Sequence, residues 1–337
     1  MLPGAEAVPE IDGAAPGAPG DALLASVRPV VLRGLVRDWP FVQAARTSFD
    51  AARAYLGRHY RDAAVVAMLG APDIEGRFFY NDDLSGFNFA PLRVKLDAVL
   101  GELAGHYANP APPAIYVGST TIDTCLPGFR NENDVDLGAR DALASIWIGN
   151  RTRIAAHYDL PDNLACVAAG RRRFTLFPPQ QLENLYIGPL DLTPAGQAIS
   201  LVDFQRPDLE RFPKFREAMR HALVAELGPG DALFIPSMWW HHVEALDPFN
   251  VLVNYWWRQS PPFMDTPTNA LMHALMSVRD LPPEQRRAWQ ELFRHYVFES
   301  TDATAAHIPP HARGVLAPLD DDATRLLRAQ LLKRMNR

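Results

Sequence analysis

GPGDALFIPSMWWHHVEALDPFNVLVNYWW, residues 228–257, is the stretch of this sequence that most clearly predicts the fold. It holds two apolar runs, 232–235 and 250–257, bounded by turn-forming residues, and such runs are typical of β-strands. Upstream, further short strands are expected at residues 27–35, 77–80, 115–117, 145–148, 154–158, 164–168 and 173–177. Many short strands separated by Gly and Pro predict a sandwich or jelly roll rather than a parallel α/β sheet.

Helices are expected on both sides of these strands. Apolar residues recur at helical spacing in residues 49–56 and 92–103, and a helix-like insert interrupts the strands at residues 203–227. After Pro262 the pattern predicts helices at residues 268–277, 283–298 and 320–333. The chain is therefore divided into a mobile tail rich in Gly, Ala and Pro (1–20), an N-terminal α/β extension (21–113), a β core (114–258) and a C-terminal helical segment (259–337).

Composition narrows the class of protein. The formal net charge of −6 gives no electrostatic footprint for nucleic acid, so a nucleic-acid substrate is not expected. No run approaches the length of a membrane span, and the N-terminus lacks the pattern of a signal peptide. The two cysteines, Cys125 and Cys166, form no CxxC pair. These features predict a cytoplasmic protein with reduced thiols.

The segment His157-Tyr158-Asp159 is a candidate metal site. Residues two apart on a strand point to the same face, so His157 and Asp159 can bind one ion from a single strand. A histidine of the downstream pair His241-His242 would complete the two-His, one-carboxylate set that holds non-haem Fe(II). His-x-Asp pairs are common by chance, and the alternative is a strand-end pair that caps a turn. Spacing leaves the choice between the two histidines open, since neighbours on a strand point in opposite directions.

Three blocks of this chain resemble the JmjC-type, cupin-like 2-oxoglutarate oxygenases, a family that includes the asparaginyl hydroxylase that inhibits hypoxia-inducible factor. They are HYDLPDNLACVAAGRRRFTLFPP (157–179), the opening stretch 228–257, and the entry segment 28–35 with Asp38-Trp39-Pro40. The resemblance covers roughly residues 28–258. It implies a mainly β fold with α additions, namely a double-stranded β-helix (jelly roll) with an N-terminal α/β extension and C-terminal helices.

The resemblance also implies a ligand set and a cosubstrate. Fe(II) would be held by His157, Asp159 and His241, the histidine directly after the two tryptophans, and His242 would pack nearby. The far carboxylate of 2-oxoglutarate needs a cation, and strand alternation puts Arg172 on the face of Phe174 and Leu176. The family has lysine at that position. Arginine can also bind a carboxylate, although the difference leaves the identity of the cosubstrate open.

Five other residues are candidates for the same pocket. Asn163 and Asn254 match asparagines that line it in the family, and Trp256 shares a strand face with Asn254. Tyr116 lies where the family has a tyrosine on the cosubstrate carboxylate, and packing in the core is the alternative. For Trp240 two interpretations stay open, a core residue and a wall of the substrate pocket.

The function implied is a 2-oxoglutarate-dependent dioxygenase that uses Fe(II) and O₂, hydroxylates a C–H bond of a protein side chain or small molecule, and releases succinate and CO₂. Hydroxylation and demethylation are both compatible with this chemistry, and the substrate is not readable from the sequence. Two alternatives remain. One is a cupin metalloenzyme with the same triad and no 2-oxoglutarate, and the other is a non-catalytic cupin-like binding protein.

The C-terminal segment carries apolar residues at helical spacing, such as Trp289, Leu292, Phe293 and Tyr296. An apolar stripe of this kind must be buried against something. The resembling hydroxylase buries its own against a second copy, so a homodimer is expected. The alternative is that these helices fold back onto their own barrel.

Overall fold

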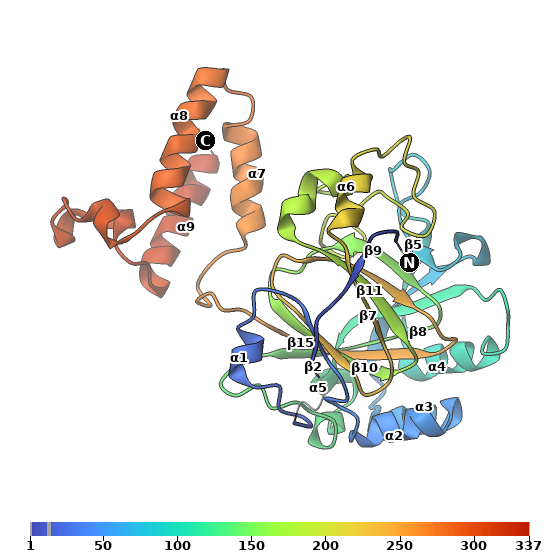
Figure 1. Ribbon diagram of the computed structural model, residues 1–337. Coiled ribbons are helices and arrows are strands. Elements are labelled where there is room, and N and C mark those ends of the chain that lie inside the picture. The colour runs from blue at the N-terminus through green and yellow to red at the C-terminus, as the bar shows by residue number, and fades with distance from the viewer. Residues whose placement is uncertain (1, 12–14, 337) are drawn as a thin grey trace. The chain divides into compact units, whose positions relative to one another are not determined.

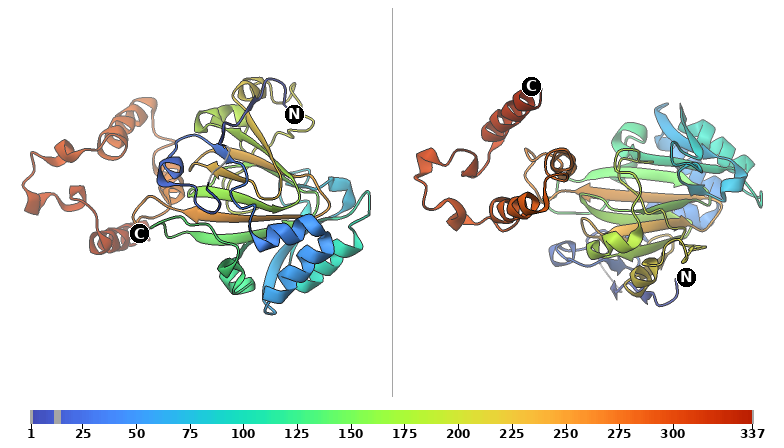
Figure 2. Two further views of the ribbon diagram at one scale, coloured as in Figure 1. Left: turned by 60° about the horizontal axis from the view of Figure 1, so that its bottom comes forward. Right: turned by 90° about the horizontal axis from the view of Figure 1, so that it is seen from above.

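The computed structural model describes residues 2–11 and 15–336 of the chain. It divides into two compact units, residues 1–259 and residues 260–337. In the first unit the described residues form two β-sheets with helices on their outer faces (Figure 1). Figure 2 shows the two sheets stacked face to face. The second unit is helical.

The smaller sheet has six strands in the order β1-β12-β11-β14-β9-β5. Their bounds are β1 Glu6–Ala7, β12 Leu223–Leu227, β11 Arg172–Phe177, β14 Trp240–Ala245, β9 Arg153–His157 and β5 Arg77–Phe78. The larger sheet has nine strands in the order β2-β3-β13-β10-β15-β8-β7-β4-β6. Their bounds are β2 Glu10–Ile11, β3 Val30–Leu32, β13 Ala232–Ile235, β10 Asp162–Ala169, β15 Asn250–Trp257, β8 Leu143–Gly149, β7 Ala114–Thr121, β4 Ala64–Gly70 and β6 Phe89–Lys95.

Apolar side chains from both sheets meet in the space between them. Phe174 and Leu176 of β11 pack there with Leu233 of β13, and all three are almost fully buried. Each such side chain contributes about 1.5–3 kcal/mol on burial. The central strands pair antiparallel, as β10 does with β13 and β15. The prediction of a jelly-roll core with helical additions is therefore confirmed.

The outer faces of the two sheets are covered differently. Helices α2 (Pro40–Thr47), α3 (Phe49–His59) and α4 (Leu96–Gly105) pack on the nine-stranded sheet (Figure 1). The Ser48 hydroxyl accepts a hydrogen bond from the Ala51 amide at 3.1 Å and caps the start of α3. The six-stranded sheet is covered by a 3₁₀ helix, Pro179–Leu185, and by α6, Phe215–Arg220. Each sheet thus keeps one face for the space between the sheets.

A glycine turn between β10 and β11 determines which way Arg172 points. Gly170 has φ of +68°, and a Cβ there would lie 2.4 Å from the Asn250 side chain. Only glycine is compatible with that turn. β11 begins two residues later at Arg172, which lines the cavity between the sheets together with Phe174.

The expectation of a mobile N-terminal tail is wrong for the residues that the structure describes. β1 pairs with β12 and β2 pairs with β3, both in parallel. Leu2 and Val8 are buried, with 7% and 2% of their surface exposed. These two apolar side chains, together with free backbone groups on the sheet edges, are enough to hold a segment of low-complexity composition. Residues 1 and 12–14 lie outside the described residues.

Two other expected elements differ from the structure. Residues 92–95 belong to strand β6 and not to the helix predicted from residue 92; they pair with β4, and α4 begins at Leu96. Of the insert predicted as helix-like at 203–227, only α6 is α-helical. Its last residues form β12, because Leu223–Leu227 alternates on a sheet and pairs with β11.

The described residues of the second unit include three α-helices in the predicted positions. They are α7 (Pro267–Ser277), α8 (Pro283–Phe293) and α9 (Asp321–Met335), and one π-helical turn, Arg294–Phe298, continues α8. None of the residues of α7, α8 or α9 is buried. Across the described residues, no helix combines the length and the apolar composition needed to cross a membrane.

Candidate metal centre

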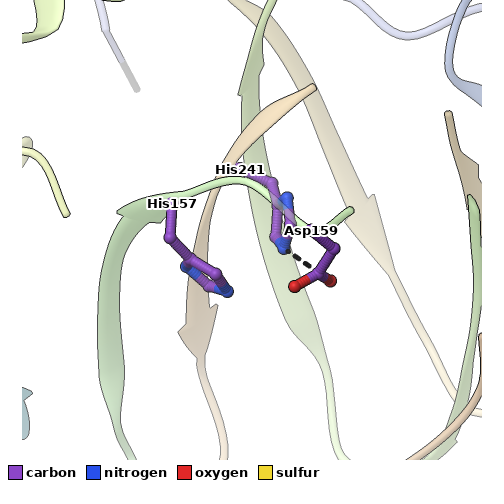
Figure 3. A group of neighbouring side chains, drawn as sticks. All are labelled: His157, Asp159 and His241. Atoms are coloured by element: carbon purple, nitrogen blue, oxygen red, sulfur yellow. Dashed lines mark ion pairs between the residues drawn. The ribbon is translucent and has the colours of Figure 1, made fainter. Parts of the chain in front are cut away.

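Two neighbouring strands bring the His157, Asp159 and His241 side chains together (Figure 3). β9 pairs antiparallel with β14, and His157 is directly opposite His241 in this pairing. Asp159 follows two residues after His157, beyond the end of β9. One ligand atom from each of the three lies within 4.8 Å of the others, and His241 Nε2 is 3.6 Å from Asp159 Oδ2. One ion could contact all three residues.

Backbone hydrogen bonds determine the tautomer of both histidines. His157 Nδ1 is 2.9 Å from the Ala155 carbonyl oxygen, and His241 Nδ1 is 3.0 Å from that of Trp239. A carbonyl oxygen only accepts, so each Nδ1 carries the hydrogen and donates. In the neutral ring Nε2 then has the free lone pair through which a histidine ligates a metal.

The electrostatics of the site favour neutral imidazole at His241. Burial, followed by the neighbouring His157, lowers the pKa of His241 to about 4, although Asp159 acts in the opposite direction. At neutral pH the ring is therefore unprotonated. Two imidazoles and one carboxylate are the donor set of non-haem Fe(II) sites, so these residues fit that metal.

Two side chains hold the Asp159 carboxylate. Asn163 Nδ2 donates to Asp159 Oδ2 at 3.3 Å, and Trp256 Nε1 donates to the same oxygen at 3.1 Å. Asn254 Nδ2 in turn donates to Asn163 Oδ1 at 3.2 Å. Asn163, Asn254 and Trp256, all three singled out in the sequence, thus lie together at the carboxylate of the triad.

The triad opens into a cavity of about 310 Å³ between the two sheets. Its walls are mostly apolar and aromatic, among them Met68, Phe78, Trp147, Phe174, Ile199 and Leu252. A volume at the lower end of the range for ligand pockets suits a small molecule or one side chain. The same cavity is lined by Arg172 and Tyr116.

Arg172 is a buried cation without a protein counter-ion. Only 1% of its surface is exposed, and among the described residues no carboxylate lies within 4.0 Å of it and its Nε has no hydrogen-bond partner. The neighbouring arginines are compensated: Arg171 pairs with Asp247 at 2.9 Å and Arg173 with Glu226 at 3.1 Å. Burial lowers the pKa of Arg172 below its ordinary value. A buried charge of this kind requires a partner, which here has to come from a ligand.

Tyr116 lies beside this guanidinium. Its side chain is buried, and burial raises its pKa to about 12, against an opposing effect of Arg172. The phenol therefore stays protonated and can donate a hydrogen bond at any physiological pH. Tyr116 also packs against Phe78, so core packing, one of its two predicted roles, is observed.

Trp240 does not line the cavity, so its interpretation as a pocket wall is wrong. Neighbouring strand residues face opposite sides, and His241 faces inward. Trp240 therefore lies on the outer face, where its ring packs edge-on against Tyr158 at 5.0 Å. His242 also faces outward, and its ring lies 4.8 Å from that of Phe204. The geometry thus separates His241, which reaches the other two ligands, from His242.

Several lining residues were missed in the sequence. The loop residues Pro194, Ala195 and Gln197 carry no pattern that would indicate a pocket. Trp147 could have been found, since alternation within the strand predicted at 145–148 places it opposite Ile146 and Ile148, both of which lie in the outer core.

Comparison with known proteins gives partial matches to several of them. The chain is 35% identical to HSPB1-associated protein 1 of Homo sapiens, over 45% of this chain and 31% of that protein. It is 34% identical to tRNA wybutosine-synthesizing protein 5 of Danio rerio, over 39% and 41%. It is 28% identical to Lysine-specific demethylase 8 of Xenopus tropicalis, over 70% and 49%. The matched part spans less than half the length of each relative.

A family model covers more of the chain than these relatives do. The model described as "Cupin-like domain" matches residues 18–263, which include both sheets except β1 and β2 together with every residue of the candidate metal centre. Because this match extends over more than half of the 337 residues, the chain belongs to the cupin-like domain family.

Proposed function

We propose that this protein is an Fe(II)- and 2-oxoglutarate-dependent dioxygenase that hydroxylates a C–H bond of a protein side chain or small molecule. The observation that carries the proposal is Arg172, a buried cation with no carboxylate of the described residues beside it, in the cavity that also contains the triad. A dicarboxylate cosubstrate supplies the missing anion at one end and metal ligands at the other. The names of two relatives, a lysine-specific demethylase and a tRNA wybutosine-synthesizing protein, are compatible with a reaction of this class.

Each residue of the site then has a defined task. His157, Asp159 and His241 hold Fe(II) through Nε2, a carboxylate oxygen and Nε2. The Arg172 guanidinium binds the far carboxylate of 2-oxoglutarate, and the Tyr116 hydroxyl donates a hydrogen bond beside it. Asn163 and Trp256 keep the Asp159 carboxylate in one orientation. The apolar walls exclude water from the reacting groups.

With metal and cosubstrate bound, the chemistry supplied is an oxidation in which 2-oxoglutarate and O₂ become succinate and CO₂, and one oxygen atom enters the C–H bond of the substrate. Demethylation is the same oxidation applied to an N-methyl group. The net charge of −6 supports a protein or small-molecule substrate over nucleic acid.

The test combines metal analysis with succinate release. Purified protein loaded anaerobically with Fe(II) is expected to retain one ion per chain and to release succinate from 2-oxoglutarate in air. Metal retention without 2-oxoglutarate binding would favour a cupin metalloenzyme of another type. Absence of both would favour a non-catalytic binding protein.

We further propose that the protein is a homodimer assembled through its second unit, and that it is cytoplasmic. The dimer is supported by the exposed apolar residues of α7, α8 and α9, where Leu271, Trp289 and Leu292 each expose more than 40% of their surface. The location is supported by Cys125 and Cys166, which are both buried free thiols.

A further inference from the structure

A chain of hydrogen bonds leads from Trp147 to the carboxylate of Asp159. Trp147 Nε1 donates to Asn254 Oδ1 at 2.7 Å. Asn254 then donates to Asn163 at 3.2 Å, and Asn163 donates to Asp159 at 3.3 Å. Trp147, Asn254 and Asn163 come from β8, β15 and β10, which are adjacent strands of the nine-stranded sheet. The three side chains therefore cross the inner face of that sheet toward the triad.

Chemistry at the two ends determines the direction of every link. An indole N–H only donates, and an ionised carboxylate only accepts. Each asparagine between them must therefore accept on the side of Trp147 and donate on the side of Asp159. The orientation of both amides follows from this logic and does not depend on telling their nitrogen from their oxygen.

Burial makes this orientation costly to change. Asn163 and Asn254 expose 6% and 1% of their surface, so neither amide can turn to water. A rotated Asn254 would direct its oxygen at the oxygen of Asn163 and would leave Trp147 without an acceptor. Unpaired buried polar groups of this kind are strongly unfavourable.

Trp147 also contacts the groups at both ends of the cavity. Its ring stacks on Tyr116, with centroids 5.9 Å apart, and Tyr116 lies beside Arg172. On its other side it meets Trp256 edge-on at 5.7 Å, and Trp256 is the second donor to Asp159 Oδ2. One side chain therefore contacts the tyrosine at the cation, the Trp256 ring that donates to the metal carboxylate, and the Asn254 amide that reaches it through Asn163.

We propose that Trp147 is a positioning residue, which fixes the orientation of the Asp159 carboxylate through Asn254 and Asn163 and supports Trp256 from the side. This proposal rests on the proposed function, since it takes Asp159 to be a metal ligand. Trp147 itself need not touch the metal. Its effect is on how firmly the metal is held.

The test measures Co(II) binding by titration of the visible absorption of the bound ion, which requires no turnover. Trp147→Phe keeps an aromatic ring and removes only the donor, and we expect about ten-fold weaker Co(II) binding, the low end of what loss of a partner behind a metal ligand causes. Trp39→Phe is the matched control. Trp39 is buried more deeply than the half-buried Trp147, and its Nε1 donates to the Asp134 carbonyl oxygen at 3.0 Å, remote from the triad. It is expected to lower the melting temperature and leave Co(II) affinity unchanged.

A second variant tests the direction of the chain. In Asn254→Asp the side chain can still accept from Trp147 but cannot donate to Asn163, and we expect Co(II) binding to weaken more than in Trp147→Phe. Wild-type affinity in both variants, or an equal loss in Trp39→Phe, would overturn the role of Trp147. If the wild-type protein itself bound no Co(II), the metal site of the proposed function would fall, a result that the variants cannot imitate.

Discussion

The two faces of the six-stranded sheet differ in how buried charge is compensated. On the outer face, Arg153 lies 3.3 Å from Asp203, and Arg173 lies 3.1 Å from Glu226 and 3.6 Å from Glu244. On the inner face, one residue before Arg173, Arg172 is more deeply buried and has no such partner among the described residues. The same strand, β11, carries both arginines.

This difference separates structural charge from functional charge. Charges on the outer face are neutralised by the chain itself, so they contribute to folding and need nothing else. The inner face gathers Arg172 and Asp159 around a cavity, and their partners have to be supplied from outside. A protein retains an uncompensated buried charge at a cost in stability, which is a physical reason to expect a ligand there.

The largest effect is expected from removing the carboxylate of the triad. Asp159→Ala should abolish retention of Fe(II) or Co(II), because two neutral imidazoles remain without a charged ligand. The matched outer-face variant is His242→Gln, which should lower stability and leave metal retention intact, since His242 packs on Phe204. Metal analysis after gel filtration measures both. If His242→Gln lost the metal while His241→Gln kept it, the assignment of the two histidines would be reversed.

Replacing Arg172 is expected to have a smaller effect, which concerns binding of the cosubstrate and not binding of the metal. A charge-assisted hydrogen bond is worth about 1.5–3 kcal/mol, so Arg172→Leu should weaken 2-oxoglutarate binding roughly ten- to hundred-fold. Without ligand, the same variant should be as stable as wild type or more so, because leucine removes an uncompensated buried charge.

Arg173→Leu should have the opposite effects on 2-oxoglutarate binding and on stability, and it therefore serves as the control. It leaves Glu244 without the Arg173 guanidinium and leaves Glu226 dependent on Arg171, 3.6 Å away, so thermal stability should fall while 2-oxoglutarate binding persists. Calorimetric titration and thermal unfolding of the two variants measure the contrast. Equal effects on 2-oxoglutarate binding would contradict the distinction between the two faces.

Much of this contrast was accessible from the sequence, because alternation along a strand is a local property. It separated Arg172 from its two neighbours, paired Asn254 with Trp256, and showed that His241 and His242 face opposite ways. The strands expected at 232–235 and 250–257 have the bounds of β13 and β15. The family resemblance is confirmed by the match to the cupin-like domain model.

What the sequence could not supply depends on contacts between distant segments. β12 looked like part of a helix because its apolar residues become a strand only through pairing with β11. β1 and β2 are two residues each and have no pattern of their own. The hydrogen-bond chain from Trp147 joins residues more than a hundred positions apart, and only the order of the strands brings them side by side.

An effect of intermediate size on metal affinity is expected from Trp256, which donates directly to Asp159. Trp256→Phe removes one of two hydrogen bonds to Oδ2 and should weaken Co(II) binding about ten- to hundred-fold. Its neighbour Trp257 faces the other way and stacks on Phe234, so Trp257→Phe should leave the affinity unchanged. An unaltered affinity in Trp256→Phe would mean that Asn163 alone suffices to hold the carboxylate.

The two units differ in how their apolar side chains are covered, as the two faces of the sheet differ in how their charges are compensated. Replacing an apolar residue of the second unit is expected to have no effect on metal binding. In the first unit the chain itself buries a large apolar core, whereas α8 has no buried residue: its Trp289 and Leu292 expose 45% and 43% of their surface, and Tyr296, one turn further, exposes 45%. Their spacing forms one stripe, which requires a partner surface just as Arg172 requires an anion.

Leu292→Glu should therefore convert the proposed dimer into a monomer in sedimentation experiments at micromolar concentration. Gln290→Glu adds the same charge outside the stripe and should leave the dimer intact. Both variants should retain Co(II) like the wild type, and a wild-type protein that sediments as a monomer would contradict the proposed assembly.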